Sequence, residues 1–371
     1  MDKTSLSGFK RAPFSAVFEE KSRGVRKIKQ KDYLQNGYHP IIDQGQNEIA
    51  GYCNEEEGLF LEVPAIVFGD HTRCIKYVQK PFFAGADGVK ILKPKLSDNV
   101  RFWYHALKAT RIENLGYSRH FKLLKQSSFR IYDHNREKCI TERLDCIQSQ
   151  IEVAKRQTEW LDTLVKSQFV EMFGDIRTNA FGWPIRTFED ISELITDGEH
   201  ATPKRQEDGI YLLSARNVKN HTLDLSDVDF IGEDEYKRIA RRIIPQEGDV
   251  LISCSGTIGR CCVVPPGVKF QMVRSAALIR FTNRIDPIFA EWLIASSDVQ
   301  EQIKKSATQS SQANLFQGRI KKLKGIVPPL DLQQEFAAFV AQVDKSKSIA
   351  RKQIEKLQLL YDSLAQEYFG D

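Results

Sequence analysis

The chain lacks long apolar runs and paired cysteine motifs. No uncharged apolar stretch of about 18 residues occurs along its 371 residues, which argues against a membrane-spanning helix, and no charged-then-apolar leader opens the sequence. Its 7 cysteines are scattered, odd in number and without a CxxC pair, which favours reduced thiols over a zinc site. We therefore expect a soluble, cytoplasmic protein without a metal site.

Catalytic signatures are missing as well. The sequence contains no Gly-x4-Gly-Lys-Ser/Thr loop for phosphates, no Asn-Pro-Pro-aromatic site of an adenine methyltransferase and no Gly-x-Ser-x-Gly elbow. A glycine-rich stretch at 83–88 precedes a strand-like run instead of the helix that a cofactor loop requires, so we interpret it as a turn. These absences favour a binding protein, with a stand-alone nucleic-acid enzyme of unrecognised site as the alternative.

The composition that is present predicts two folded domains. Apolar residues make up 41% of the chain, with 22 Phe, 11 Tyr and 4 Trp, which is enough to bury real cores. The net charge of +5 is modest, but Lys and Arg gather in three clusters, at 21–31, 237–242 and 319–324. Each cluster alone is explained by a solvated surface, whereas the three together favour nucleic acid as a partner.

An internal repeat organises the chain. Phe173-Gly174-Asp175 recurs as Phe369-Gly370-Asp371, and carrying this offset of 196 backwards gives ten identities in 22 gap-free positions. In both copies apolar residues recur at alternating spacings of three and four, which is the pattern of a coiled-coil seam. Each copy therefore predicts a helix of about 35 residues, roughly 50 Å long, that ends at its glycine. Ordinary amphipathic helices packed on their own domains are the alternative.

Different segments precede the two helices. Both are rich in short strand-like runs broken by turns, with helices at 101–107 and 287–295, and this mixture predicts an α+β class. The two segments share no convincing alignment, so we expect a copied helix behind unlike domains. We place the first domain at 1–135, the first helix at 136–175, the second domain at 176–329 and the second helix at 330–371, with capping by Asn135 and Asp331. Antiparallel pairing of the helices would separate the domains and relate them by a pseudo-twofold axis.

Several motifs resemble those of one family. In the second half these are ITDGEHATP at 195–203, LSARNV at 213–218, GDVLIS at 248–253 and SGTIGR at 255–260. In the first half they are IDQG at 42–45, IVFGDHTR at 66–73, GADGVK at 85–90 and GYSRHFK at 116–122. Their order, together with the helical repeat and the VPPL start of the second helix, resembles the specificity subunit of bacterial type I restriction–modification enzymes. The first helix departs from this pattern because it lacks the Pro-Pro start, and the first domain has no SGTIG stretch.

The resemblance implies a non-catalytic DNA-binding subunit. Its two target recognition domains would read a bipartite target in double-stranded DNA, and its long helices would dock two modification subunits. Those partners would methylate adenine N6 from S-adenosylmethionine, and restriction (motor-nuclease) subunits would use ATP and Mg²⁺, so that this chain itself binds no cofactor. A coiled-coil protein scaffold that binds no DNA is a further alternative.

The family-like loops and the basic residues beside them supply candidate DNA contacts. Lysines hold phosphates, whereas Arg and Asn can pair with purine edges. The phosphate candidates are Lys122, Lys125, Lys204 and Lys322, and the base-reading candidates are Arg73, Arg119, His120, Arg216, Asn217 and Arg260. Asp70 and His71 would orient Arg73 or contact a base, and the remaining candidates are Thr72, His200, Ser255 and Thr257. Arg216 and Asn217 have a turn-stabilising role as their alternative.

Apolar residues outside the helical seam predict a second, protein-binding surface. Exposed apolar patches of this kind mark partner sites. The candidates are Val153, Trp160, Phe169, Phe173, Ile349, Leu360 and Phe369. The alternative is that the recognition domains themselves cover these side chains.

Overall fold

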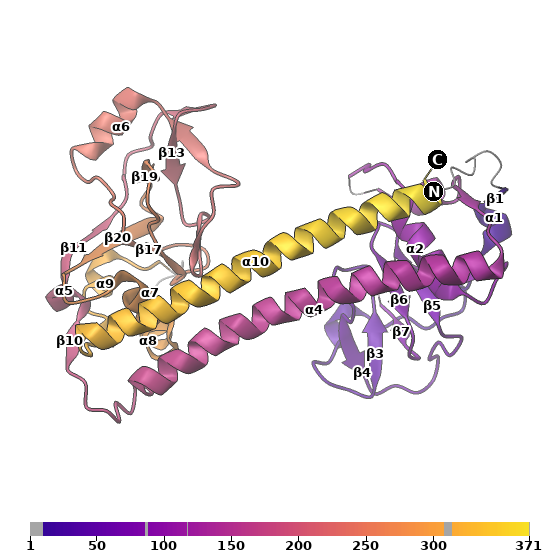
Figure 1. Cartoon of the computed structure of the whole chain (residues 1–371), viewed down its shortest axis with the longest axis horizontal. Coiled ribbons are helices and arrows are strands. Elements are labelled where there is room, and N and C mark those ends of the chain that lie inside the picture. Colours follow the sequence, from indigo (N-terminus) through magenta and orange to yellow (C-terminus); the bar gives the residue numbers. More distant parts are fainter. Residues whose placement is uncertain (1–9, 86–87, 117, 308–313, 371) are drawn as a thin grey trace, which may run out of the picture. The chain divides into compact units, whose positions relative to one another are not determined.

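The computed structural model describes residues 10–85, 88–116, 118–307 and 314–370, which form two compact units. Residues 10–157 and 350–370 belong to the first unit, and residues 158–349 to the second. Two 40-residue helices, α4 (His134–Phe173) and α10 (Leu330–Phe369), contribute a segment to each unit (Figure 1). Within the described residues, no helix combines the length and apolarity needed to cross a membrane.

The first unit is built on an antiparallel four-stranded sheet. Its order is β2 (Phe18–Glu20), β8 (Val89–Pro94), β5 (Ala65–Gly69) and β6 (Ile75–Val78). Strand β5 is buried along its whole length, as its apolar sequence requires. The other elements are β1 (Arg11–Pro13) paired with β9 (Ser128–Arg130), the sheet β4 (Gly51–Cys53), β3 (His39–Ile42) and β7 (Phe83–Ala84), the 3-10 turn η1 (Gln30–Asp32), and the helices α1 (Phe14–Val17), α2 (Val100–Ala109) and α3 (Phe121–Leu124).

The second unit is built on a sheet of the same kind. Its order is β11 (Ser192–Asp197), β20 (Ala276–Phe281), β17 (Val250–Ser253) and β18 (Cys261–Val263). A second sheet contains β12 (Arg205–Gln206), β16 (Asp229–Ile231), β13 (Ile210–Leu213) and β19 (Phe270–Met272). The remaining elements are β10 (Ile185–Thr187) with β21 (Lys324–Ile326), β14 (Val218–Lys219) with β15 (Thr222–Leu223), and the helices α5 (Phe188–Ile191), α6 (Glu233–Ala240), α7 (Pro287–Ala295), α8 (Ser297–Ala307) and α9 (Gln317–Ile320).

The two units share one topology, which corrects the expectation that only the helix is copied. The main sheets have the same strand order and directions, and each is followed by a helix whose first turn is capped, by Asn99 for α2 and by Asp286 for α7. The offset of 196 found in the long helices also relates α3 to α9 and β9 to β21. Topology depends on which positions are buried and where turns fall, so it persists where residue identities have diverged.

The helical seam predicted from the sequence is confirmed. All nine seam positions of α4 between Leu144 and Met172, and all nine of α10 between Val340 and Tyr368, are buried or half-buried. The predicted ends need small corrections, because Asp133 caps α4 by accepting a hydrogen bond from the Arg136 N–H (2.9 Å), and α10 begins one residue before Asp331. Gly174 ends α4 with a φ of 79°, a conformation that suits glycine.

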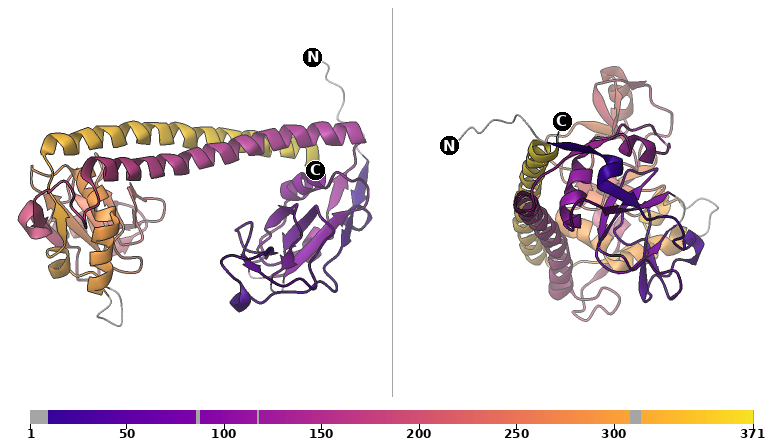
Figure 2. Two further views of the ribbon diagram at one scale, coloured as in Figure 1. Left: turned by 90° about the horizontal axis from the view of Figure 1, so that it is seen from below. Right: turned by 90° about the vertical axis from the view of Figure 1, so that its right-hand side faces the viewer.

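Within each unit the two helices run antiparallel and share a core with the domain. In the first unit the beginning of α4 and the end of α10 pack against α2, and in the second unit the end of α4 and the beginning of α10 pack against α7 (Figure 2). The α+β class with two antiparallel coiled-coil helices is therefore confirmed. The contributing residues are Leu144, Ile147, Ile151, Tyr361, Ala365 and Tyr368 in the first unit, and Val165, Phe169, Phe173, Phe336, Val340 and Val343 in the second.

Candidate nucleic-acid interface

The antiparallel order of each main sheet gathers a set of loops along one edge. In the first unit these are the segment after β2 (21–25), the β5–β6 loop (70–74) and Gly88, which precedes β8. We call these residues the first loop edge. In the second unit they are the segment after β11 (198–204), the β17–β18 loop (254–260) and the segment before β20 (273–275), the second loop edge. Four of the eight family-like motifs overlap these two edges, namely those at 66–73, 85–90, 195–203 and 255–260.

The β5–β6 loop is fastened to the start of α3 from inside the first unit. The buried Asp70 carboxylate accepts a hydrogen bond from the Phe121 N–H (2.8 Å), and its carbonyl accepts one from the His120 N–H (2.8 Å). The His120 ring is itself fully buried and accepts from the Leu115 N–H (3.1 Å). Neither side chain is therefore available to a base, and the structure corrects both predictions: Asp70 and His120 position the loop.

The rest of the β5–β6 loop reaches solvent. The His71 N–H donates to the Gln44 side chain (3.1 Å), which fixes the loop backbone, and Thr72 is exposed. Arg73 is half-buried with a φ of 60°, and its guanidinium donates to the Ile112 carbonyl (3.0 Å). Such a left-handed backbone is uncommon outside glycine. His71, Thr72 and Arg73 thus stay candidates for DNA contact.

Three basic side chains lie exposed around α3. They are Arg119, Lys122 and Lys125. Lys125 is partly compensated, because its ammonium lies 4.6 Å from the centre of the Phe121 ring and 3.6 Å from the Glu20 carboxylate. Since Asp70 holds the start of α3 in place, Lys122 is presented from a fixed turn beside the first loop edge.

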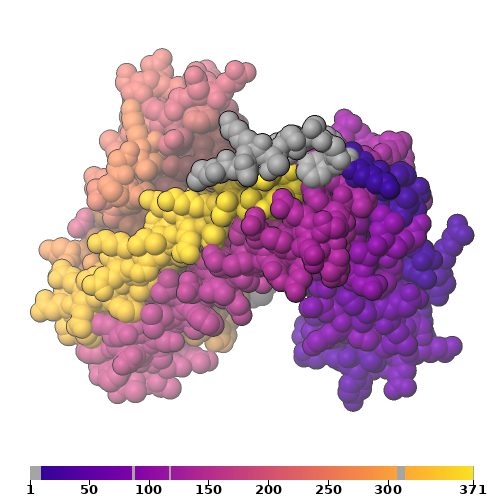
Figure 3. Space-filling view, turned by 45° about the vertical axis from the view of Figure 1, so that its right-hand side comes forward, coloured from indigo at the N-terminus to yellow at the C-terminus, as the bar shows by residue number. Residues whose placement is uncertain are grey.

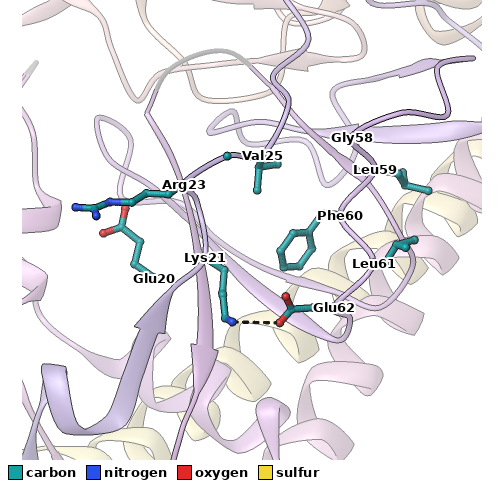
Figure 4. Close-up of a pocket in the computed structure, with 10 residues that line it drawn as sticks. Glu20, Lys21, Arg23, Val25, Gly58, Leu59, Phe60, Leu61 and Glu62 are labelled. Atoms are coloured by element: carbon teal, nitrogen blue, oxygen red, sulfur yellow. Dashed lines mark ion pairs between the residues drawn. The ribbon is translucent and has the colours of Figure 1, made fainter.

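A cavity of about 510 Å³ lies between residues 20–25 and 58–62 of the first unit (Figure 4). Lys21 forms an ion pair with Glu62 across it (3.6 Å) and another with Glu19 (3.3 Å). The hydrogen bond that the Lys21 ammonium donates to Glu19, with the charges of both carboxylates, raises the pKa of Lys21. The basic cluster at 21–31 is therefore partly neutralised, whereas Arg23 remains exposed.

The β17–β18 loop makes a tight turn at the second loop edge. Gly256 and Gly259 have φ values of 67° and 83°, which agrees with the turn expected from the sequence, and the Ser253 hydroxyl donates to the Thr257 carbonyl (2.7 Å). Thr257 is exposed and Ser255 half-buried. Arg260 is half-buried and donates to the Ala215 carbonyl (2.8 Å), so part of its guanidinium serves to join two loops.

Arg216 and Asn217 stabilise a turn, which was the alternative reading. The buried Asn217 side chain accepts from the Ser214 N–H (2.9 Å) and donates to the carbonyls of Asp224 and Asp227. Asn217 is thus corrected from a base-reading residue to a structural one. Arg216 stays exposed, but its guanidinium is paired with the Asp229 carboxylate (2.9 Å). Burial raises the pKa of Asp229, but the hydrogen bonds that it accepts from Arg205 and Arg216 outweigh this effect and lower the pKa.

A second cavity, of about 480 Å³, opens on the second loop edge and brings together residues that sequence reasoning only partly found. It is lined by Asp197, His200, Cys254, Ser255, Arg274, Ser275, Asn314, Leu315 and Phe316. His200 and Ser255 were predicted, whereas Arg274, Asn314 and Phe316 were missed. In the sequence an exposed Phe looks like a core Phe, and no motif singles out Arg274.

Other predicted residues lie apart from this cavity. Lys204 and Lys322 are exposed, Lys204 in the segment after β11 and Lys322 just beyond the end of α9. Neither lines the cavity. Among the residues that the structure describes, no cluster of three or more His, Cys, Asp or Glu is arranged to hold a metal ion.

The outer sides of α4 and α10 carry exposed apolar residues, and both helices run across the face seen in the space-filling view (Figure 3). Trp160 and Ile349 are each 68% exposed, and Val153 and Leu360 about half. Two of the other three interface candidates are corrected because they are buried, whereas Phe369 is half-buried and stays a prediction. Phe169 and Phe173 are buried in the core of the second unit, and Phe369 packs its ring against Phe102 in the first (5.2 Å between centroids).

Comparisons with known proteins identify the class. Residues 182–359 match the family model described as the type I restriction modification DNA specificity domain. A segment is 25% identical over 184 residues to a protein assigned as the type I restriction enzyme MjaX specificity subunit of Methanocaldococcus jannaschii, covering 47% of this chain but only 42% of that relative. The EcoBI specificity subunit of Escherichia coli is 22% identical over 393 residues, covering 95% of this chain and 80% of that relative.

Solved structures share the fold. The S subunit of the type I restriction–modification system from M. genitalium superposes with a TM-score of 0.59 at 15% identity, covering 100% of this chain and 98% of the other. A chain from a structure of type I system assembly and conformational transition gives a TM-score of 0.53 at 12% identity, covering 98% and 97%.

The chain has two domains of one topology, each followed by a copy of one long helix, and this is the fold of the solved specificity subunits. Residues 182–359 match the model of the type I restriction modification DNA specificity domain, and the resemblance found in the sequence is confirmed. The curated relatives reported above are named as specificity subunits, which agrees with the prediction of a non-catalytic chain.

Proposed function

We propose that the chain reads a two-part DNA target, one part at each loop edge, and that it joins this target to the catalytic subunits of a type I restriction–modification complex. The observation that carries the proposal is the shared topology of the two units. Both present a turn-rich loop edge with exposed basic or polar side chains, formed from unlike sequences. One fold with two different loop sets is what separate recognition of two half-sites requires.

Phosphate and base contacts divide between different residues. Lys122, Lys125, Lys204 and Lys322 are exposed and would hold phosphates, which gives affinity and register without sequence preference. Arg73, Arg119 and Arg260 would contact base edges, with His71, Thr72, His200, Ser255 and Thr257 beside them. Arg216 is exposed but paired with Asp229, so it would have to exchange that carboxylate for DNA.

The outer surface of α4 and α10 would dock the modification subunits. Trp160, Val153, Ile349 and Leu360 supply the exposed apolar area on helices whose inner faces are already committed to the seam. Two such subunits would use S-adenosylmethionine to methylate adenine N6, and restriction subunits would add ATP- and Mg²⁺-dependent cleavage. The chain itself would bind none of these cofactors.

The test combines co-purification with a methylation map. The chain is purified with the modification subunit from its own genome, and N6-methyladenine is mapped by long-read sequencing with and without this gene. A stable complex and an interrupted two-part motif that disappears on deletion support the proposal. Unchanged methylation without a complex favours a protein scaffold, and activity of the purified chain alone favours an unrecognised enzyme.

A further inference from the structure

We infer that Arg274 and Phe316 determine the base preference of the second unit, Arg274 by pairing with a guanine and Phe316 by apolar contact with a neighbouring base. The inference rests on the proposed function, since it names which residues of the second loop edge read the target. Neither residue belongs to the family-like motifs. Both line the cavity of about 480 Å³ at this edge.

Arg274 differs from the other arginines around the second loop edge. Arg216, Arg238 and Arg242 are each paired with a carboxylate, at 2.9, 2.9 and 2.7 Å. Within the described part of the chain, no hydrogen bond or ion pair occupies the exposed Arg274 guanidinium. Its backbone is nevertheless held, because the Arg274 N–H donates to the Glu199 carbonyl (3.1 Å). An uncompensated fork of donors on a held backbone is suited to the O6 and N7 acceptors of guanine.

Phe316 is a large apolar side chain on an anchored backbone. It is 59% exposed, while its neighbour Leu315 is buried and donates its N–H to the Cys254 carbonyl (2.9 Å). The Phe316 carbonyl accepts from the N–H groups of Arg319 and Ile320 at the start of α9. The ring is therefore held out by its surroundings and does not belong to a loose loop. An aromatic ring so placed can contact a thymine methyl group or wedge against a base step.

The rest of the cavity supplies polar groups between these two side chains. Asp197 is held by His200 (2.8 Å) and Arg242 (2.7 Å), so its charge is compensated and does not repel a base edge. Ser255 and Asn314 add hydroxyl and amide groups to the lining. The cavity therefore combines the Arg274 guanidinium, the exposed Phe316 ring and neutral polar groups, and such a surface suits the edge of a nucleobase. A lining of uncompensated carboxylates would instead repel DNA.

The test maps N6-methyladenine in cells that carry Arg274→Ala or Phe316→Ala in place of the natural chain. Arg241→Ala and Phe181→Ala are matched controls, because both side chains are exposed in the same unit and neither lines the cavity. Arg274→Ala should lower the preference for guanine at one position of one half-site by about 5- to 150-fold, the range for a bidentate pair. Phe316→Ala should relax an adjacent position, with the other half-site unchanged.

The outcomes distinguish a failure of the proposed function from a failure of this inference alone. If the natural chain yields no two-part motif, the proposed function fails and this inference fails with it. If it yields a two-part motif that both variants leave unaltered, this inference alone is overturned. Co-purification of each variant with the modification subunit at the natural yield shows that the chain has folded. Equal relaxation by the control variants also overturns the assignment, because the effect would then not depend on the cavity.

Discussion

The carboxylate of Asp70 accepts a hydrogen bond from the Phe121 N–H at 2.8 Å, and this bond joins two segments 51 positions apart in the chain. Asp70 directly follows β5, the most deeply buried strand of its sheet, and Phe121 begins α3. The sequence left open whether Asp70 contacts a base or orients Arg73. Its buried position shows that it instead places the turn from which Lys122 is presented.

Replacing Asp70 tests this positioning role. Asp70→Ala leaves the Phe121 N–H without its acceptor inside the unit, so the free energy of unfolding should fall by about 1–3 kcal/mol in urea titrations. Recognition of the first half-site should weaken with it in the methylation map. Asp70→Asn keeps an acceptor oxygen and should retain most of both properties. Equal behaviour of the two variants would contradict the role of this bond.

The stability of the first unit should depend on pH through His105. The buried His105 ring on α2 lies 2.7 Å from the Tyr361 hydroxyl of α10 and 2.8 Å from the Asp145 carboxylate of α4. Burial lowers the pKa of His105 and outweighs the hydrogen bond that its ring donates to the Asp145 carboxylate, while the nearby charges of Arg101 and Lys108 lower it further. The folded chain thus holds a neutral ring, whereas the unfolded chain takes up a proton near the ordinary value of 6.5.

The sign follows from this difference in proton uptake. Stability from His105 is present above pH 6.5 and is lost as the pH falls below it, by up to about 1.4 kcal/mol for each pH unit. Urea unfolding at pH 8.0 and 5.5 should show a smaller loss for His105→Gln, which cannot titrate, than for the natural chain. A loss of the same size in both would show that His105 does not hold the pH dependence.

Trp160 and Phe173 should separate docking from folding, although the sequence assigned both to one surface. Trp160→Ala removes an exposed side chain, so it should change the free energy of unfolding by less than about 0.5 kcal/mol and weaken binding of the modification subunit by about 2 kcal/mol or more. Phe173→Ala empties a fully buried site and should cost about 3–5 kcal/mol of stability. Isothermal titration and urea unfolding measure the two effects, and undiminished binding by Trp160→Ala would exclude this docking surface.

The sequence predicted those features that depend on periodicity. The seam positions of α4 and α10 and the strands around Val67 and Leu251 follow from apolar spacing alone, and the structure agrees. Burial of a polar residue inside a loop leaves no such signal. Asp70 and Asn217 look like surface residues in the sequence, yet each satisfies several backbone groups that only the folded chain brings together.

The shared topology of the two units could not be predicted from the sequence either. Strand order depends on long-range pairing such as β2 with β8 and β11 with β20, which residue identity does not reveal once the loops have diverged. The cavity around Arg274 was missed for the same reason. Its lining comes from segments that are more than 100 residues apart, between Asp197 and Phe316, and that converge only when β20 enters the sheet between β11 and β17.

Lys322 should contribute to affinity without altering the motif. If it holds one phosphate, Lys322→Ala should reduce the slope of log K against log salt by about 0.9 and weaken binding to all sequences alike. Lys321→Ala is the control, because Lys321 is paired with Glu189 (3.0 Å). Filter binding of the complex across a salt series measures the slope. A slope that stays constant, or a changed motif, would contradict a phosphate contact.

The central claim is that two units read two half-sites independently, and one methylation map tests it most directly. Arg73→Gly alters the first loop edge while keeping the left-handed φ of 60°, and Arg274→Ala alters the second. N6-methyladenine is mapped in cells carrying each variant. The account predicts that each variant relaxes or loses one half of the motif, a different half for each, with the spacer unchanged. Loss of the same half by both, or equal loss of both halves by either, would contradict it.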